Sequence, residues 1–304
     1  MIYVSVQPDN PYFFWQVEVY CHNLINWGVK PSDIHVVWLC DKVQSDGLRD
    51  LMTRVRACHF LYQIEDVKGY LPALKPQGMK HHFHRLGDKK FLYHDSDIIF
   101  LKKPMLDAHC ACSWSASDCK SYLSSEYIKS KSPQLFNDMC NLVGVNPRYI
   151  ETFDSVAGGA QWIMNNTSYE FWEKVEKDSV NLYYLAKSHP SQTEIKHPIQ
   201  SWTAEMWATL WNAIAFGKNV AISKGIDFTF ATSRYSETDR VKILHMAGVT
   251  HSQRKELFFK GDYTQKSPIG ENFEHLSKDY ASWRYVEEMK KIHNFVLNSD
   301  VHYL

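Results

Sequence analysis

The stretch that most constrains this chain is residues 91–104, where two carboxylates interrupt an otherwise apolar segment. Asp95 and Asp97 stand one residue apart, with residues 91–94 before them and 98–101 after them. Apolar runs of this length, rich in aromatic and β-branched residues, are typical of buried strands. Carboxylates between buried strands cost free energy unless a cation pairs with them, so the pattern predicts a divalent metal at a strand end. The alternative is an exposed Asp-Ser-Asp turn, although a surface turn does not need apolar flanks.

Composition narrows the class of protein. The 304 residues are 44% hydrophobic and 14% aromatic, which is enough for one large domain or one domain with an appendage. The formal net charge is zero and no run rich in Lys and Arg occurs, which counts against a protein that lives on nucleic acid. The seven cysteines have no disulfide-framework spacing, so reduced thiols are expected. No signal peptide or apolar run of spanning length is found, and we therefore expect a cytoplasmic protein without stable membrane insertion.

Strands and helices are expected to alternate in the first third of the chain, as judged from hydrophobic periodicity. The expected strands are residues 2–6, 34–40, 59–64 and 91–94, and the expected helices are residues 12–27, 45–56 and 77–86. This alternation predicts an α/β fold with a Rossmann-like parallel sheet flanked by helices. Ligands of such folds bind beyond the carboxyl ends of the strands, where Val6, Asp41 and Asp95 stand. No G-x-G-x-x-G follows the first strand, which argues against a nicotinamide cofactor.

The second half of the chain is less regular. Residues 113–132 are polar and Ser-rich and are expected to form loop and short helix. Gly158 and Gly159 allow a backbone to approach a ligand closely, with a plain bulge or turn as the alternative, and a strand is expected from Ala160 onward. Helices are expected over 169–187, around 198–212 and over 277–297, with strands at 220–222 and 242–245.

Two titratable residues in this half are candidates for chemistry. Glu205 lies among Trp202, Met206 and Trp207 in an expected helix, and burial in this apolar setting would favour its use as a general base. A solvated Glu on the outer helix face is the alternative. His245 ends an expected strand before small residues, where it can bind a metal or serve a structural role.

Four features occur in one order along the chain: an N-terminal α/β half, a strand–Asp-x-Asp–strand segment, a Gly-Gly strand segment and a late Leu-His-x-x-Gly. In this the chain resembles GT-A glycosyltransferases over roughly residues 1–250. The resemblance implies a mixed sheet flanked by helices in a domain of residues 1–250, with residues 251–304 as a C-terminal helical extension packed on it. Asp95 and Asp97 match the metal motif of that family, and His245 matches the late histidine of glycogenin-like members. Residues 157–160 match the Gly-containing segment beside the donor sugar.

A closer similarity is to hydroxyproline arabinosyltransferases and peptidyl-serine galactosyltransferases. Their Lys-Pro before the metal motif corresponds to Lys75 and Pro76, and their Trp-x-x-Glu-Met corresponds to residues 202–206, which strengthens the case for Glu205. Those eukaryotic enzymes carry secretory-pathway anchors and this sequence shows none. The difference favours a cytoplasmic, bacterial or phage relative and leaves a peptide acceptor open.

The resemblance implies transfer of a sugar from a nucleoside diphosphate, UDP above all, to an acceptor hydroxyl of a glycan, a peptide or a modified nucleic acid. Asp95, Asp97 and His245 would hold Mn²⁺ or Mg²⁺, and the imidazole favours manganese. The implied catalytic residues are Asp97 and Glu205, with Glu205 as the base if the enzyme inverts. The implied donor contacts are Val6, Asp41, Lys75, Asp95, Ser96, Gly158, Gly159 and Gln161.

Three other functions remain possible on the sequence. The same chemistry could act on hydroxymethylated or otherwise modified phage DNA bases, although the neutral charge counts against it. A metal-dependent phosphohydrolase would need more acidic or His ligands near the first motif. A non-catalytic sugar-nucleotide-binding module is the third, and the intact set of metal ligands argues against it.

Overall fold

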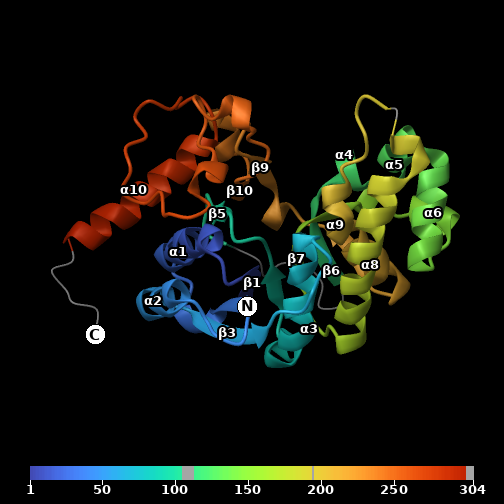
Figure 1. Ribbon diagram of the computed structural model, residues 1–304, viewed down its shortest axis with the longest axis horizontal. Coiled ribbons are helices and arrows are strands. Elements are labelled where there is room, and N and C mark those ends of the chain that lie inside the picture. Colours follow the sequence, from blue (N-terminus) through green and yellow to red (C-terminus); the bar gives the residue numbers. More distant parts are fainter. Residues whose placement is uncertain (105–112, 194, 299–304) are drawn as a thin grey trace. The chain divides into compact units, whose positions relative to one another are not determined.

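A computed structural model describes residues 1–104, 113–193 and 195–298, and the chain divides into two compact units (Figure 1). The terminal unit comprises Tyr3–Leu61, Asp95–Asp107 and Gly225–Leu304, so it draws on both ends of the chain. The middle unit comprises Met1–Ile2, Tyr62–His94 and Ala108–Lys224. Both units combine strands with helices, which confirms the predicted α/β class.

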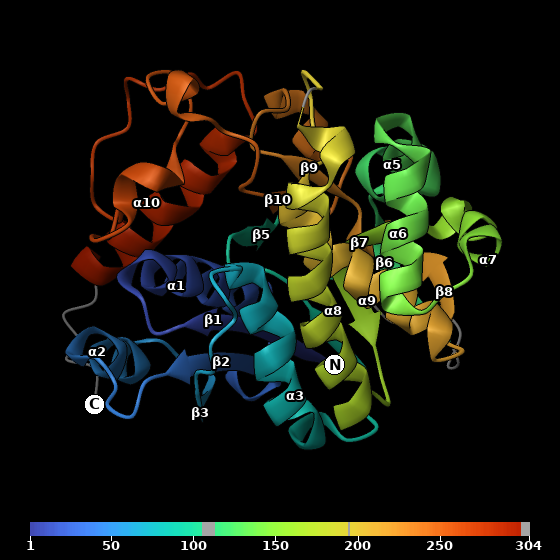
Figure 2. The ribbon, with the colours of Figure 1, turned by 45° about the vertical axis from the view of Figure 1, so that its right-hand side comes forward.

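The first half of the terminal unit is built as its hydrophobic pattern predicts. β1 (Ile2–Pro8) pairs in parallel with β2 (Ile34–Cys40), and β3 (Cys58–Gln63) follows β2 in the sheet (Figure 2). Every residue of β2 is buried, which is why its apolar run is unbroken. The connections are α1 (Pro11–Asn26) and α2 (Asp46–Arg54). Ser45 caps α2 by accepting a hydrogen bond from the Leu48 N–H, as expected for a Ser at this position.

The rest of the terminal unit is a small sheet and a helix. β10 (Ile243–His245) pairs antiparallel with β5 (Ile98–Phe100) and parallel with β9 (Phe228–Phe230). Both views place α10 (Ser282–Asn298), in red, beside α1, in dark blue (Figures 1 and 2). One hydrophobic cluster joins these elements, with members such as Trp15, Val19, Ile99, Leu244, Phe258, Tyr285 and Met289. The C-terminal residues therefore share a core with the first helix.

The strands of the middle unit pair in both directions. β7 (Gly158–Met164) pairs antiparallel with both β4 (Phe91–Tyr93) and β6 (Ser113–Asp118), and β6 pairs in parallel with β8 (Asn219–Ile222). α8 (Tyr169–Ser188) packs against α3 (Leu74–Leu86), α6 (Pro133–Val143) and α9 (Ala204–Ala215), as Figure 1 shows. The remaining helices are α4 (Lys120–Leu123), α5 (Ser125–Lys131) and α7 (Pro147–Glu151).

The prediction of loop and short helix for residues 113–132 is wrong at its start. β6 occupies this stretch, and the middle unit buries Ser115 and Ser117, which are 3% and 0% exposed. The Ser117 hydroxyl accepts a hydrogen bond from the Gln161 N–H, so its polarity is satisfied inside the sheet. A Ser-rich segment therefore forms an inner strand of the sheet, and the Gln161 N–H on β7 supplies the partner that water would otherwise provide to Ser117.

Two further expectations concern the whole chain. Of the described helices, none combines the length and the apolar character that a membrane crossing requires. Among the described residues the cysteines are free thiols, namely Cys21, Cys40, Cys58, Cys119 and Cys140. Cys110 and Cys112 lie outside the described residues.

Candidate active site

The predicted metal ligands converge in the terminal unit. Asp95 and Asp97 directly precede β5, and His245 ends β10, which pairs with β5 so that His245 lies opposite Ile98. The Nε2 atom of His245 is 3.5 Å from Oδ2 of Asp95 and 3.3 Å from Oδ1 of Asp97. One ligand atom from each of the three residues lies within 4.8 Å of the others. The local strand pairing thus brings together side chains that are far apart in sequence.

The donor set fits a divalent cation. Asp97 is only 5% exposed. The two carboxylates offer hard oxygen ligands and the imidazole offers a nitrogen ligand, a combination that suits Mn²⁺. The Nδ1 atom of His245 is buried and has no hydrogen-bond partner in the part of the chain that the structure describes. The Met246 N–H donates to the Asp97 carbonyl at 2.9 Å, which fixes the histidine strand against the carboxylate segment. These contacts hold the three side chains in place before any ligand arrives.

Lys260 is a component of the cluster that the sequence analysis missed. Its ammonium forms an ion pair with Oδ2 of Asp97, and its side chain is 28% exposed. Burial raises the pKa of Asp97, but Lys260 and His245 more than offset this and hold that pKa well below its usual range. Burial lowers the pKa of Lys260, and Asp97 more than reverses the effect. No spacing rule could have singled out Lys260, which follows Asp97 by 163 positions.

The other terminal-unit residues predicted to contact a donor lie at different depths. Ser96 is 6% exposed, and its hydroxyl donates to Oε1 of Gln16 on α1 at 3.0 Å, which ties the Asp-x-Asp segment to that helix. Val6 is buried within β1, and Asp41 is exposed just after β2. Ser96 therefore has a structural partner within the unit, while Asp41 is the accessible member of this group.

Glu205 lies at the centre of a buried network in the middle unit. It is 3% exposed, which excludes the solvated alternative. Its Oε2 atom is 2.9 Å from Nζ of Lys75. Its Oε1 atom accepts hydrogen bonds from the Tyr93 hydroxyl at 3.0 Å and from Thr209 at 3.3 Å. The sequence analysis selected Lys75 and Glu205 separately, and the structure makes them an ion pair.

The surroundings of this network differ from the expected tryptophan pocket. Trp207 is buried, but the Trp202 side chain is 59% exposed. The groups that contact the Glu205 carboxylate are therefore mainly polar. The Glu205 N–H donates to the Tyr70 hydroxyl at 2.9 Å, and that hydroxyl donates to the Trp202 carbonyl at 2.7 Å. A buried carboxylate with these partners is held in one orientation.

The glycine pair begins β7. A Cβ atom on Gly158 would lie 2.4 Å from the Ser117 carbonyl oxygen and 2.8 Å from Ile222, so the close approach at this glycine is to neighbouring strands of the same unit. Gln161 is fully buried, and neither its Oε1 nor its Nε2 atom has a hydrogen-bond partner among the described residues. A buried amide without a partner costs about 1–3 kcal/mol of stability.

Replacing Gly158 by Ala is expected to lower the free energy of unfolding by about 1–3 kcal/mol, because the added methyl group overpacks the β6–β7–β8 sheet. Gly159→Ala is the matched control, since its nearest contact would be the Leu123 side chain at 3.2 Å. Urea unfolding measures both variants. A Gly158→Ala protein no less stable than Gly159→Ala would contradict the packing argument.

Comparisons with known proteins give structural similarities only. No protein-family model matches the chain, and no curated protein matches it. Solved structures similar to the chain are glycosyltransferases. They include the bifunctional glycosyltransferase WbbM, at 13% identity and a TM-score of 0.49, with 98% of this chain and 51% of that chain covered. This chain thus spans about half the length of WbbM.

Two further solved structures are of the same kind. Galactosyltransferase LgtC, in complex with donor and acceptor sugar analogs, is 11% identical with a TM-score of 0.43, and 96% of each chain is covered. Glycosyltransferase GlyE from Streptococcus pneumoniae is 10% identical with a TM-score of 0.47, with 98% of this chain and 63% of that chain covered.

Proposed function

We propose that this protein is a metal-dependent glycosyltransferase that moves a sugar from a nucleoside-diphosphate sugar, UDP-linked in the first instance, to an acceptor hydroxyl. The observation that carries the proposal is the cluster of Asp95, Asp97 and His245, with Lys260 beside it. The set combines ligands for a divalent cation with a separate ammonium, which is the chemistry that a diphosphate requires.

The chain's own residues would divide the work as follows. Asp95, Asp97 and His245 would hold Mn²⁺ or Mg²⁺, which when bound would supply charge to stabilise the leaving diphosphate. Lys260 would bind a phosphate oxygen as a point charge, since its ammonium already lies against Asp97. Glu205 would accept the proton of the acceptor hydroxyl if the reaction inverts. The donor contacts that the resemblance implies stay proposals, namely Val6, Asp41, Lys75, Asp95, Ser96, Gly158, Gly159 and Gln161.

The experiment that tests the function is a thermal-shift screen of UDP-, GDP-, TDP- and CMP-sugars, each with Mn²⁺ and with EDTA. A donor that binds only the folded state raises the melting temperature, and the rise grows with the logarithm of the donor concentration relative to its dissociation constant. We expect one nucleotide class to raise it with Mn²⁺ and not with EDTA. Equal affinity for the nucleotide sugar with Mn²⁺ and with EDTA, measured by calorimetry, would show that donor binding does not depend on a metal.

Replacing His245 by Ala is expected to weaken Mn²⁺-dependent binding of the UDP-sugar by at least about tenfold, because the metal loses its nitrogen ligand. Isothermal calorimetry measures the affinity, and a melting curve reports whether the fold is kept. His275→Ala is the matched control, since His275 is exposed in the same unit. If donor binding by His245→Ala depends on Mn²⁺ as it does in the wild type, His245 is not a metal ligand and its role is structural.

Two alternatives have distinct outcomes in the same experiments. A non-catalytic sugar-nucleotide-binding module would bind the donor without releasing UDP or transferring sugar. A transferase acting on modified DNA bases would turn over only with a nucleic-acid acceptor, and the zero net charge disfavours it.

The free described cysteines fit a reducing compartment, and we propose the cytoplasm as the place of action.

A further inference from the structure

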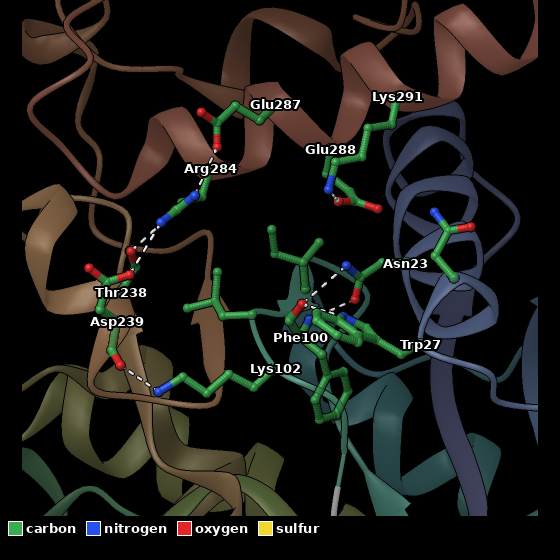
Figure 3. Close-up of a pocket in the computed structure, with 13 residues that line it drawn as sticks. Asn23, Trp27, Phe100, Lys102, Thr238, Asp239, Arg284, Glu287, Glu288 and Lys291 are labelled. Atoms are coloured by element: carbon green, nitrogen blue, oxygen red, sulfur yellow. Dashed lines mark hydrogen bonds and ion pairs between the residues drawn. The ribbon is translucent and has the colours of Figure 1, made fainter.

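A separate cavity of about 340 Å³ opens within the terminal unit (Figure 3). Asp97 stands directly before the first residue of β5, whereas Phe100, the last residue of that strand, and Lys102 line the cavity. Three residues of strand span roughly 10 Å, so the cavity lies at the opposite end of β5 from the proposed metal ligands. None of the residues assigned above to metal or donor lines it.

The wall formed by α1 and β5 is held rigidly. The Asn23 side chain accepts a hydrogen bond from the Phe100 N–H at 2.7 Å and donates to the Phe100 carbonyl at 3.1 Å. The Trp27 indole N–H donates to the same carbonyl at 2.9 Å. Figure 3 shows these side chains gathered on one side of the cavity. The cavity is therefore preformed on this side, as small-molecule sites usually are.

The charges around the cavity cancel. Its lining has three cationic side chains and three carboxylates, namely Lys102, Arg284, Lys291, Asp239, Glu287 and Glu288. Arg284 is shared between Asp239 at 3.3 Å and Glu287 at 3.4 Å, and Lys291 donates to Glu288 at 2.8 Å. A lining without net charge offers little to a nucleotide, a phosphate or a metal ion, so it favours a neutral ligand.

Glu288 contributes a carboxylate with one weakly partnered oxygen to the lining. The residue is 3% exposed, and its Oε1 atom has no hydrogen-bond partner among the described residues. The Nδ1 atom of His22 is 3.4 Å from this oxygen, a distance typical of a weak ion pair. Burial raises the pKa of Glu288, but His22 and Lys291 more than offset this and keep that pKa below its usual value. A buried, ionised oxygen of this kind is stabilised by an O–H or N–H donor from a ligand.

The remaining lining is apolar, with Trp27, Ile99 and Leu101 beside the polar groups. A pyranose ring combines hydroxyl donors at its edge with apolar C–H faces, so it matches both parts of this lining. The volume lies near the lower end of the range for ligand sites, which suits one ring. We propose that the cavity binds a single neutral saccharide unit, free or at the end of a glycan, independently of the metal centre.

The test is an NMR titration of the full-length protein with methyl glycosides of glucose, galactose, mannose and N-acetylglucosamine. We expect at least one of them to shift the indole N–H signal of Trp27 saturably, and to do so equally in EDTA. Glu288→Leu should weaken this binding about tenfold, because the acceptor is lost. Glu274→Gln, an exposed carboxylate of the same unit, should not change it.

Three results would overturn the proposal. One is the absence of a saturable Trp27 shift with any of the four glycosides, which the wild-type protein decides even if Glu288→Leu fails to fold. Another is a shift caused by glycine, a zwitterion, and by none of the sugars. The third is a folded Glu288→Leu protein with wild-type affinity. Because the titration is repeated in EDTA, its outcome is independent of whether the proposed metal-dependent transfer is correct.

Discussion

Replacing Asp97 by Asn is expected to lower sugar transfer by about 10²–10³-fold, the loss typical when one element of a charge-stabilising site is removed. Asp97 is the buried member of the cluster and contacts both His245, at 3.3 Å, and Lys260. An amide binds a divalent cation more weakly than a carboxylate does, so Mn²⁺ affinity falls together with the rate. Initial rates with saturating Mn²⁺ and a UDP-sugar measure the effect.

The substitution also changes stability, and this contribution can be separated. Asp97→Asn would leave the Lys260 ammonium without its counter-charge, at a cost of roughly 1–3 kcal/mol, since that side chain is partly exposed. Combining Asp97→Asn with Lys260→Met removes both charges and should recover part of the lost stability without recovering transfer. Asp262→Asn is the matched control, because this exposed carboxylate pairs with Arg254 in the same unit. Wild-type transfer by Asp97→Asn would exclude Asp97 from the mechanism.

The second large effect concerns Glu205. Replacing Glu205 by Gln is expected to lower transfer by about 10²–10⁴-fold while leaving donor affinity near that of the wild type, because a positioned general base contributes a factor of this size. Hydrolysis of the donor by water should fall as well if the base acts on any acceptor. Rates of transfer and hydrolysis, together with calorimetry of donor binding, make the measurement.

Burial makes a matched control essential for this variant. Glu205→Gln removes the ion pair between Glu205 and Lys75, so some stability is lost whether or not Glu205 is catalytic. Asp178 is also 3% exposed in the middle unit and pairs with Lys174 at 2.8 Å. We expect Asp178→Asn to lose stability with transfer per folded molecule unchanged. Near-normal transfer by Glu205→Gln would show that Glu205 is not the general base. A product with retained anomeric configuration would instead make Glu205 a residue that positions the acceptor.

Much of the fold could be predicted because its signals are local. The unbroken apolar run of β2 reflects burial of the whole strand, and Ser45 caps α2 through a contact three residues away. β6 could not be predicted in this way, because Ser115 and Ser117 become core residues only when β7 pairs with them. Periodicity describes what a segment prefers, whereas pairing with a distant strand decides what a polar segment becomes.

The residues of the candidate site also fall into two groups, those that the local sequence indicates and those that only the folded chain brings together. The local sequence indicated Asp95 and Asp97, because carboxylates between two apolar runs are visible within a few residues, whereas His245 was assigned through the resemblance to glycogenin-like enzymes. Only the tertiary structure paired Lys260 with Asp97 and Lys75 with Glu205, across separations that no local pattern spans. The physical reason is that an ion pair depends on the distance between two side chains in space. That distance is determined by the path of the chain, which the composition of a single segment does not contain.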